Sequence, residues 1–260
     1  MTAVQPSAAI VTGGGSGVGR ATALALSAHG TKVWVVGRDR ARLERVRAEA
    51  SCPGTVTLAP FDATDGAAMD RLIAEADPDL VVLSAGARAR LAPVHEQTWE
   101  SFSEPWNTDV KIAFQVGQTA IRRPLRAGSL VVIVSSGAGL GGSPLSGGYA
   151  GAKRMQMFLA GYLQRAAAAV KVDVRFVAVV PKQLIAGTEL GAMAADAYAG
   201  LAGISREKFM ERFGAPLTAE TVAGIIVQLA RGPVGVGVDV GRAGSNGSIL
   251  GISGAGVEAL

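Results

Sequence analysis

The chain has 260 residues, of which 49% are hydrophobic, and a formal net charge of +4 at pH 7. This length and composition suit one α/β domain with a large core, and the scattered basic residues make a nucleic-acid-binding protein a weak alternative. The lone cysteine, the two distant histidines and the lack of a long apolar run predict a cytoplasmic protein without disulfides, metal ligands or membrane spans.

The first predicted element is a short apolar strand over residues 7–12. A glycine-rich turn, Gly13 to Gly19, leads from it into an alanine- and leucine-rich helix that ends at Gly30. Such a turn lets the backbone approach a pyrophosphate, which the free N–H groups and the helix dipole then hold. A lone glycine cluster is a weak signal, but strand, glycines, helix and second strand in this order predict a dinucleotide-binding protein.

A second apolar strand, Lys32 to Val36, indicates which dinucleotide binds. The residue at its tip faces the adenosine ribose in such folds, where an acid would hold the 2′-hydroxyl and an arginine accommodates a 2′-phosphate. Gly37 stands where the acid would be, and Arg38 follows it before a helix that runs through Glu49. The pattern favours NADP, with a solvated Arg38 at the helix start as the alternative.

The third strand, Val56 to Ala59, leads to Asp62 at its carboxyl end, where ligands bind in parallel sheets. A role as a capping or loop carboxylate is the plainer interpretation of Asp62. Thr64 or Asp65 can cap the next helix, which runs to about Ala76.

The fourth strand spans Asp79 to Leu83, and the small residues after it leave room for a flat ring beside the backbone. Residues 96–123 have a helical pattern that is broken at Pro105. Four aromatic residues of this segment are expected in the core or at a subunit contact, namely Trp99, Phe102, Trp106 and Phe114.

The fifth strand and the helix after it carry the residues with the clearest chemistry. Val131 to Val134 are predicted to form a buried strand, and Ser136 lies just past its end. Tyr149 and Lys153 begin a helix that runs to about Val170, and their spacing puts them on one face. A tyrosine is a poor base at neutral pH, but a nearby ammonium group favours its phenolate form. Although Tyr-x-x-x-Lys alone often arises by chance, the three residues together predict a proton-transfer site for a carbonyl or an alcohol.

The rest of the chain is predicted to hold a sixth strand, Asp173 to Val180, a helix, Thr218 to Arg231, and a last strand, Val236 to Val240. Residues 184–213 are apolar without a clean helical period, and we expect them to form a lid over a bound ligand. An ordinary surface helix pair is the alternative. The glycine- and serine-rich tail, residues 242–260, is expected to be partly loose.

These elements together predict an α/β fold. Seven strands that alternate with helices give a single Rossmann-type domain over residues 1–260, with a doubly wound parallel sheet and helices on both faces. No repeat or domain boundary interrupts it. The glycine loop and the serine, tyrosine and lysine all fall at strand carboxyl ends, so we expect them to meet at one edge of the sheet.

The chain resembles the short-chain dehydrogenase/reductase family over residues 7 to about 240. Asp62 matches the acid that holds the adenine amino group, and Arg38 matches the basic residue of NADP-preferring members. The family's T-G-x-x-x-G-x-G loop and its catalytic serine and Y-x-x-x-K are carried by Thr12, Gly13, Gly17 and Gly19, and by Ser136, Tyr149 and Lys153.

The resemblance implies interconversion of a ketone and a secondary alcohol by hydride transfer with NADP(H). Tyr149 would protonate the alkoxide, Ser136 would hydrogen-bond the same oxygen, and Lys153 would support the tyrosine and bind the nicotinamide ribose. The apolar segment 184–213 suggests a substrate with hydrophobic bulk. Cofactor contacts are expected from Thr12, Gly13, Gly15, Ser16, Gly17, Val18, Gly19, Arg38, Asp62, Ala63, Ser84, Ala85, Gly86, Tyr149, Lys153, Pro181 and Lys182.

The resemblance also implies partners. Besides the small-molecule substrate, we expect a second copy of the chain, in a homodimer or homotetramer built through the helices at residues 99–120 and 149–169. No nucleic acid or membrane is expected to bind.

Three positions depart from the family pattern. Its N-N-A-G becomes Leu83-Ser84-Ala85-Gly86, and its Pro-Gly after the sixth strand becomes Pro181-Lys182. Its structural and catalytic asparagine aligns best with Asp109, with Asn107 as an alternative in a shifted register. An ionised aspartate only accepts hydrogen bonds, so Asp109 can draw Lys153 toward itself. The second change is expected to place a positive charge near the pyrophosphate or the substrate.

These departures keep two alternatives open. With an acid at Asp109 and Lys182 beside the cofactor, the same fold can serve dehydration, isomerisation or cyclisation. A non-catalytic NADP-binding protein is the other alternative, and the retained serine, tyrosine and lysine argue against it.

Overall fold

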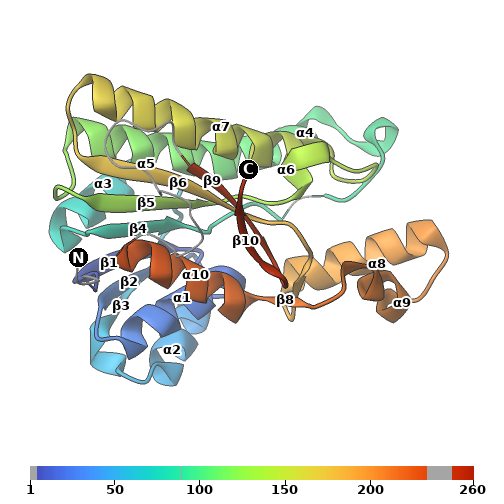
Figure 1. Cartoon of the computed structure of the whole chain (residues 1–260), viewed down its shortest axis with the longest axis horizontal. Helices are drawn as coiled ribbons and strands as arrows, with labels where there is room; N and C mark the ends of the chain where they lie inside the picture. Colours follow the sequence, from blue (N-terminus) through green and yellow to red (C-terminus); the bar gives the residue numbers. More distant parts are fainter. Residues whose placement is uncertain (1–4, 89, 233–247) are drawn as a thin grey trace.

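The structure, a computed structural model, describes residues 5–88, 90–232 and 248–260. Its central feature is an eight-stranded sheet with the order β10-β9-β6-β5-β4-β1-β2-β3 (Figure 1). All neighbouring pairs of this sheet are parallel except β9 and β10. The strands are β1 (Ala8–Thr12), β2 (Lys32–Val36), β3 (Val56–Ala59), β4 (Leu80–Leu83), β5 (Ser129–Val134), β6 (Val174–Pro181), β9 (Ser248–Ser253) and β10 (Gly256–Ala259).

Helices cover both faces of the sheet, each over its own buried apolar cluster. The two clusters take alternate strand residues, as Val11 and Ile10 of β1 illustrate, because successive side chains of a strand point to opposite faces. One face carries α1 (Gly17–Ala28), α2 (Arg40–Glu49) and α10 (Ala219–Arg231), and the other carries α3 (Gly66–Ala76), α5 (Lys111–Arg122) and α7 (Gly147–Ala169). The predicted doubly wound α/β fold is therefore confirmed.

The shorter elements connect this framework. Three of them are single turns or little more: η1 (Pro53–Thr55), η2 (Val94–Glu96) and α6 (Ala138–Gly141). Caps predicted from sequence form as expected at α3, where the Asp65 carboxylate accepts a hydrogen bond from Ala68 N at 3.0 Å.

The helical segment with the predicted break at Pro105 consists of three consecutive pieces. They are α4 (Trp99–Pro105), a π-helical turn η3 (Trp106–Val110) and α5. Proline has no N–H to donate, so the regular hydrogen-bond ladder cannot pass through it. The chain widens into the π turn instead of ending, and this turn carries Asp109 into the protein interior.

The carboxyl-terminal part of the chain is more ordered than its composition suggested. The strand predicted at Val236 to Val240 lies outside the described residues. The expectation of a loose tail is wrong for residues 248–259, because β9 extends the sheet beside β6 and β10 returns antiparallel along it. Backbone hydrogen bonds to β6 and the buried side chains of Leu250 and Ile252 stabilise this segment.

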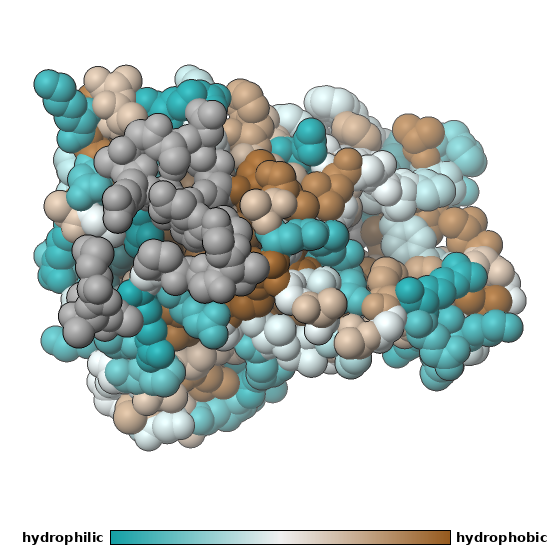
Figure 2. Space-filling view, viewed as in Figure 1, coloured by the Kyte–Doolittle hydropathy of each residue, from teal (hydrophilic) through white to brown (hydrophobic). Residues whose placement is uncertain are grey.

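Residues 184–213 form short elements that project beyond the sheet (Figure 1). β7 (Ile185–Ala186) pairs with β8 (Leu217–Thr218) at the base of this projection. Hydrophobic and hydrophilic residues are interspersed on its surface (Figure 2). The projection itself consists of α8 (Glu189–Ala202), α9 (Arg206–Met210) and η4 (Glu211–Phe213).

Two further findings concern only the described part of the chain. Within it, every helix is too short or too polar to cross a membrane. The same residues contain no group of three histidine, cysteine or acidic side chains that could hold a metal ion.

Candidate active site

A cavity of about 1010 Å³ opens at the carboxyl ends of the parallel strands. This volume lies at the upper end of the range for small-molecule sites. Its wall is built by the glycine loop after β1, the tips of β2 and β4, the loop after β5, the start of α7 and the chain that follows β6. The candidate residues from distant parts of the sequence therefore meet at the predicted edge of the sheet.

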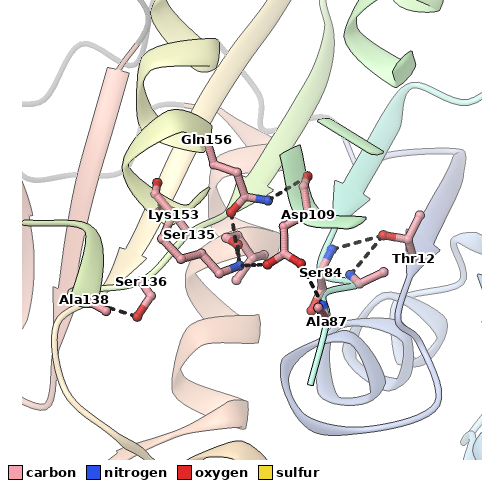
Figure 3. Close-up of polar contacts among 11 residues, drawn as sticks. Thr12, Ser84, Ala87, Asp109, Ser135, Ser136, Ala138, Lys153 and Gln156 are labelled. Carbon is pink, nitrogen blue, oxygen red and sulfur yellow. Dashed lines mark hydrogen bonds and ion pairs between the residues drawn. The ribbon is translucent and has the colours of Figure 1, made fainter. Parts of the chain in front are cut away.

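The glycine loop fits tightly between β1 and β4. Gly13 has a φ of +67°, and a Cβ on it would lie 2.8 Å from backbone atoms of Ala85, so glycine is required there. Thr12 Oγ1 fixes the same contact by accepting hydrogen bonds from Ser84 N at 3.2 Å and Ala85 N at 3.1 Å (Figure 3). Ser84 thus takes part through its backbone.

The first turn of α1 is open to an anion. The helix begins at Gly17, and within the described chain the Ser16 side chain caps none of its first N–H groups. Unpaired N–H groups at a helix start, with the positive end of the helix dipole, form a ready anion site. The loop residues Gly15, Ser16 and Val18 line the cavity beside them, so this end of the cavity fits a pyrophosphate.

The tip of β2 places the positive charge of Arg38 beside the carboxylate of Asp62. Arg38 Nη1 lies 3.7 Å from Asp62 Oδ2, and its side chain is 81% exposed. Hydrogen bonds from Thr64 lower the pKa of Asp62 against the opposing effect of burial, and Arg38 lowers it further. Arg40 and Arg42 also stand near, but Arg40 pairs with Glu44 at 3.0 Å.

Arg42 is engaged elsewhere. Its Nη1 lies 2.8 Å from Glu189 Oε1 at the start of α8, and its Nε lies 3.4 Å from Asp39 Oδ2. Of the three arginines, Arg38 has the most weakly paired guanidinium.

Tyr149 and Lys153 lie on α7 as their spacing predicts. The Lys153 ammonium is 5.5 Å from the centre of the Tyr149 ring. Ser136 lines the same cavity, and its Oγ accepts a hydrogen bond from Ala138 N at 3.2 Å. The preceding residue, Ser135, is buried and donates to Lys153 O at 2.8 Å, which anchors α7 to the end of β5.

Asp109 forms a buried ion pair with Lys153 (Figure 3). Its Oδ2 lies 3.0 Å from Nζ, although the two groups do not meet at a hydrogen-bonding angle, so the attraction is mainly Coulombic. Its Oδ1 accepts from Ala87 N at 2.7 Å, and a Cβ on Gly86 would come within 2.9 Å of Oδ2. The glycine after β4 therefore makes room for the carboxylate.

The ion pair controls the charge state of the lysine. Burial lowers the pKa of Lys153, but the negative charge of Asp109, with a smaller contribution from Tyr149, outweighs burial and raises it. The ammonium therefore stays protonated at neutral pH. Asn107, the alternative to Asp109, is exposed at the cavity wall, so Asp109 is the one that contacts Lys153.

Lys182 faces a partner that the sequence did not suggest. Its ammonium pairs with Glu258 on β10, and its backbone N donates to Ile252 O at 2.8 Å. Lys182 still lines the cavity, together with Pro181. The charge expected near the pyrophosphate or substrate is therefore paired with a carboxylate of the protein.

Sequence reasoning missed Gln156, which is buried between Lys153 and Asp109. Its Oε1 accepts from Lys153 Nζ at 3.0 Å, and its Nε2 donates to Asp109 O at 3.2 Å. The available signal was its position three residues after Lys153 on the apolar side of a helix, where a polar residue needs a partner.

The segment 184–213, predicted to be a lid, contributes aromatic residues to the cavity wall. Tyr198 stacks on Phe209 with ring centres 6.0 Å apart, and Phe209 meets Phe213 edge to face at 5.7 Å. Met193 and Ala194 of α8 line the cavity beside them.

Comparisons with known proteins identify the family and the fold of this chain. The family model described as short chain dehydrogenase matches residues 7–193. L-xylulose reductase of Mesocricetus auratus is 36% identical over 127 residues, which cover 49% of this chain and 51% of that one. D-erythrulose reductase of Gallus gallus is 33% identical over 134 residues, covering 49% and 52%. The matched region thus spans about half the length of these curated relatives.

Solved structures share the fold. An NAD+-bound xylitol dehydrogenase superposes with a TM-score of 0.79 at 20% identity, covering 95% of this chain and 97% of that one. A short chain dehydrogenase from Burkholderia cenocepacia J2315 in complex with NADP has a TM-score of 0.76 at 23% identity, covering 95% and 96%. At these identities the likeness concerns the fold alone.

Proposed function

The chain belongs to the short-chain dehydrogenase family, and on this premise we propose that it is an NADPH-dependent oxidoreductase that interconverts a ketone and a secondary alcohol. Membership of this family establishes the general class, an oxidoreductase that uses a nicotinamide cofactor. The observation that carries the finer proposal is the meeting of Tyr149, Ser136 and the glycine loop in one cavity.

The residues of the cavity fit a dinucleotide. The open first turn of α1 suits the pyrophosphate, Asp62 suits the adenine amino group, and the small residues after β4 suit a flat ring. When bound, the cofactor supplies or accepts the hydride. The residues proposed to hold it are Thr12, Gly13, Gly15, Ser16, Gly17, Val18, Gly19, Arg38, Asp62, Ala63, Ser84, Ala85, Gly86, Tyr149, Lys153, Pro181 and Lys182.

Arg38 supports NADP over NAD. Its guanidinium is exposed at the tip of β2 and has only a distant contact with Asp62. A guanidinium binds a phosphate through two parallel hydrogen bonds that carry charge. The solved neighbours include one with NAD+ and one with NADP, so the preference rests on this residue.

Tyr149 is the proposed general acid and base. Its hydroxyl gives a proton to the substrate oxygen during reduction and takes it back during oxidation. Ser136 donates a hydrogen bond to the same oxygen and orients the substrate. Lys153, kept protonated by Asp109, places a fixed positive charge beside the tyrosine that transfers the proton.

The lid supports a substrate with hydrophobic bulk. Tyr198, Phe209 and Phe213 form an aromatic part of the cavity wall. The curated relatives are reductases named for L-xylulose and D-erythrulose, which are polar substrates. An apolar wall binds a hydrophobic group more strongly than a hydroxylated chain.

The non-redox alternative loses part of its support. It relied on a free acid at Asp109 and a free cation at Lys182, and both groups are engaged in ion pairs. A screen of NADPH oxidation, followed by absorbance, across sugar ketones, aliphatic ketones and aromatic ketones tests the proposal. Turnover of at least one class is expected, with apolar ketones preferred. Stoichiometric NADPH binding without turnover of any ketone would instead favour a non-catalytic protein.

A further inference from the structure

Gln156 has a single possible amide orientation. It lies one turn beyond Lys153 on α7 and is 1% exposed. Its carbonyl oxygen faces the ammonium, and its NH₂ group faces the main-chain carbonyl of Asp109 (Figure 3). A flipped amide would put donors against the ammonium and an acceptor against a carbonyl oxygen, so both contacts would become repulsive. The glutamine therefore links α7 to the π turn η3 in one fixed arrangement.

Oxygen atoms of the protein surround the ammonium of Lys153. An ammonium carries three N–H groups, and two of them donate here, to Val134 O at 3.1 Å and to Gln156 Oε1 at 3.0 Å. Asp109 Oδ2 lies 3.0 Å away as the counter-charge, outside hydrogen-bonding geometry. The lysine residue is 6% exposed, so water has little access to it.

We propose that Gln156 is a positioning residue of the proton-transfer site. Together with Val134 O and Asp109, it encloses the Lys153 ammonium as a fixed charge beside Tyr149, so the lysine acts on the tyrosine through its electric field and exchanges protons with solvent only slowly. The proposal rests on the oxidoreductase function proposed above, in which Tyr149 is the acid and base.

Gln164 provides a matched control on the same helix. It is 4% exposed, its Nε2 donates to Val174 O at 3.3 Å, and its Oε1 accepts from Phe176 N at 2.9 Å. It therefore resembles Gln156 in burial and in its number of hydrogen bonds, but it contacts no lysine. Gln156→Met and Gln164→Met each remove two buried hydrogen bonds and keep the length of the side chain. Both should lower the Tm, so stability does not separate the proposal from a purely structural role.

The direct test observes the ammonium itself. In protein labelled with ¹⁵N-lysine, the NH₃⁺ protons of exposed lysines exchange too fast with water to be seen, whereas those of an enclosed ammonium remain visible. The parent protein and Gln164→Met should each show a slowly exchanging Nζ signal that disappears in Lys153→Met. Gln156→Met should lose this signal. Its absence from the parent, or its survival in Gln156→Met, would overturn the proposal.

A second variant covers the case in which Gln156→Met does not fold. Gln156→Glu keeps an acceptor for the ammonium and loses the donor to Asp109 O. It should retain the slowly exchanging signal, and loss of the signal from a folded Gln156→Glu protein would contradict the proposal.

The pH dependence of kcat/KM gives the functional readout. In Gln156→Met, the pH of half-maximal rate should move by about one unit, as expected when a neighbouring charge changes place. Gln164→Met should keep the parent profile. An unchanged pH profile in an active Gln156→Met enzyme would contradict the positioning role of Gln156. The proposed oxidoreductase function would be unaffected by that result. If the parent turns over no ketone, the proposed function fails, and the Nζ signal still decides the role of Gln156.

Discussion

Tyr149 and Lys153 take separate parts in the proposed proton transfer, because the tyrosine is half-buried at the cavity wall while the lysine is buried with Asp109 and Gln156. The lysine ammonium lies 5.5 Å from the centre of the phenol ring, and two of its N–H groups donate to Val134 O and Gln156 Oε1. At the scale of single residues, the site therefore depends on which charges are balanced and which are free. Three substitutions examine this.

Tyr149→Phe removes only the proton donor. Turnover should fall by roughly 10²–10⁴-fold, the usual contribution of general acid catalysis. NADPH affinity, measured by fluorescence titration, should stay nearly unchanged. Tyr162→Phe on the exposed face of the same helix is the control and should keep parent kcat. Activity of Tyr149→Phe close to that of the parent would rule the assignment out.

Arg38→Asp replaces the proposed phosphate ligand with a repelling charge. The ratio of kcat/KM for NADPH over NADH should fall by roughly ten- to a hundredfold, the value of one hydrogen bond to a charged group. Arg40→Asp serves as the comparison, because Arg40 is paired with Glu44. A ratio that moves in Arg40→Asp or Arg42→Asp and not in Arg38→Asp would show that the 2′-phosphate is held elsewhere.

Asp109→Asn leaves the charge of Lys153 unbalanced. The free positive charge should then favour the phenolate of Tyr149 more strongly, so the pH of half-maximal alcohol oxidation should move to lower pH. The measurement is the pH–rate profile of oxidation in the parent and the variant. Identical profiles would mean that the aspartate at this position does not affect the proton transfer.

The same variant has a second readout in stability. The pKa of Lys153 is raised in the folded protein, so the ion pair stabilises the fold below the usual lysine range, and this stabilisation is lost as the pH rises through the raised value. The parent should exceed Asp109→Asn in free energy of unfolding by about 1–3 kcal/mol near neutral pH. The difference should shrink in strongly alkaline buffer.

At the scale of elements, two irregular pieces shape the cavity. The π turn η3 turns Asp109 inward, and the β9–β10 hairpin brings Glu258 to Lys182 at the cavity wall. Gln183 ties the hairpin to the end of the segment 184–213, since its Oε1 accepts from Gly254 N at 2.6 Å and its Nε2 donates to Phe213 O and, at 3.2 Å, to Ala215 O. The carboxyl-terminal strands thus belong to the construction of the site.

Glu258→Ala should expose a charge that the hairpin now neutralises. The freed Lys182 ammonium should raise kcat/KM for a ketone that carries a carboxylate over its neutral analogue by roughly fivefold, or about 1 kcal/mol. The Tm should change little, because exposed ion pairs contribute little to stability. Lys182→Gly should leave the parent's substrate ranking as it is. A ranking that changes in Lys182→Gly would mean that Lys182 meets the substrate despite its pairing.

At the scale of the whole molecule, one face carries aromatic side chains that the single chain leaves exposed. They lie on α4, α5 and α7, whose helices contact one another. Trp99 is 73% exposed, and Phe158 and Tyr162 stack on each other at the surface with ring centres 5.8 Å apart. Such a concentration of large apolar groups is typical of a protein interface, and we propose that a second copy of the chain covers it.

Light scattering at micromolar concentration should therefore give a multiple of the 26.4 kDa chain mass. Phe158→Arg should shift the protein toward the monomer, because it buries a charge without a partner in the proposed interface. Val94→Arg, at an exposed apolar position on η2, should leave the mass unchanged. A parent protein that runs as a monomer would contradict the proposed assembly.

The sequence by itself determined the fold class and most of the elements. Apolar strands alternate with amphipathic helices, and local rules such as helix caps and the glycine turn act over a few neighbouring residues, so they can be read from the chain. Tyr149 and Lys153 were predictable for the same reason, since their contact is set by one turn of one helix.

Only the tertiary structure decided which charges meet. Lys153 contacts Asp109, 44 positions earlier in the chain, and Lys182 pairs with Glu258 on a strand that the glycine-rich composition had concealed. Gln156 gained its role because the π turn presents a main-chain carbonyl to it. Contacts of this kind depend on the packing of separate elements and on the low dielectric of the interior, where a paired charge is stable and an unpaired one is not.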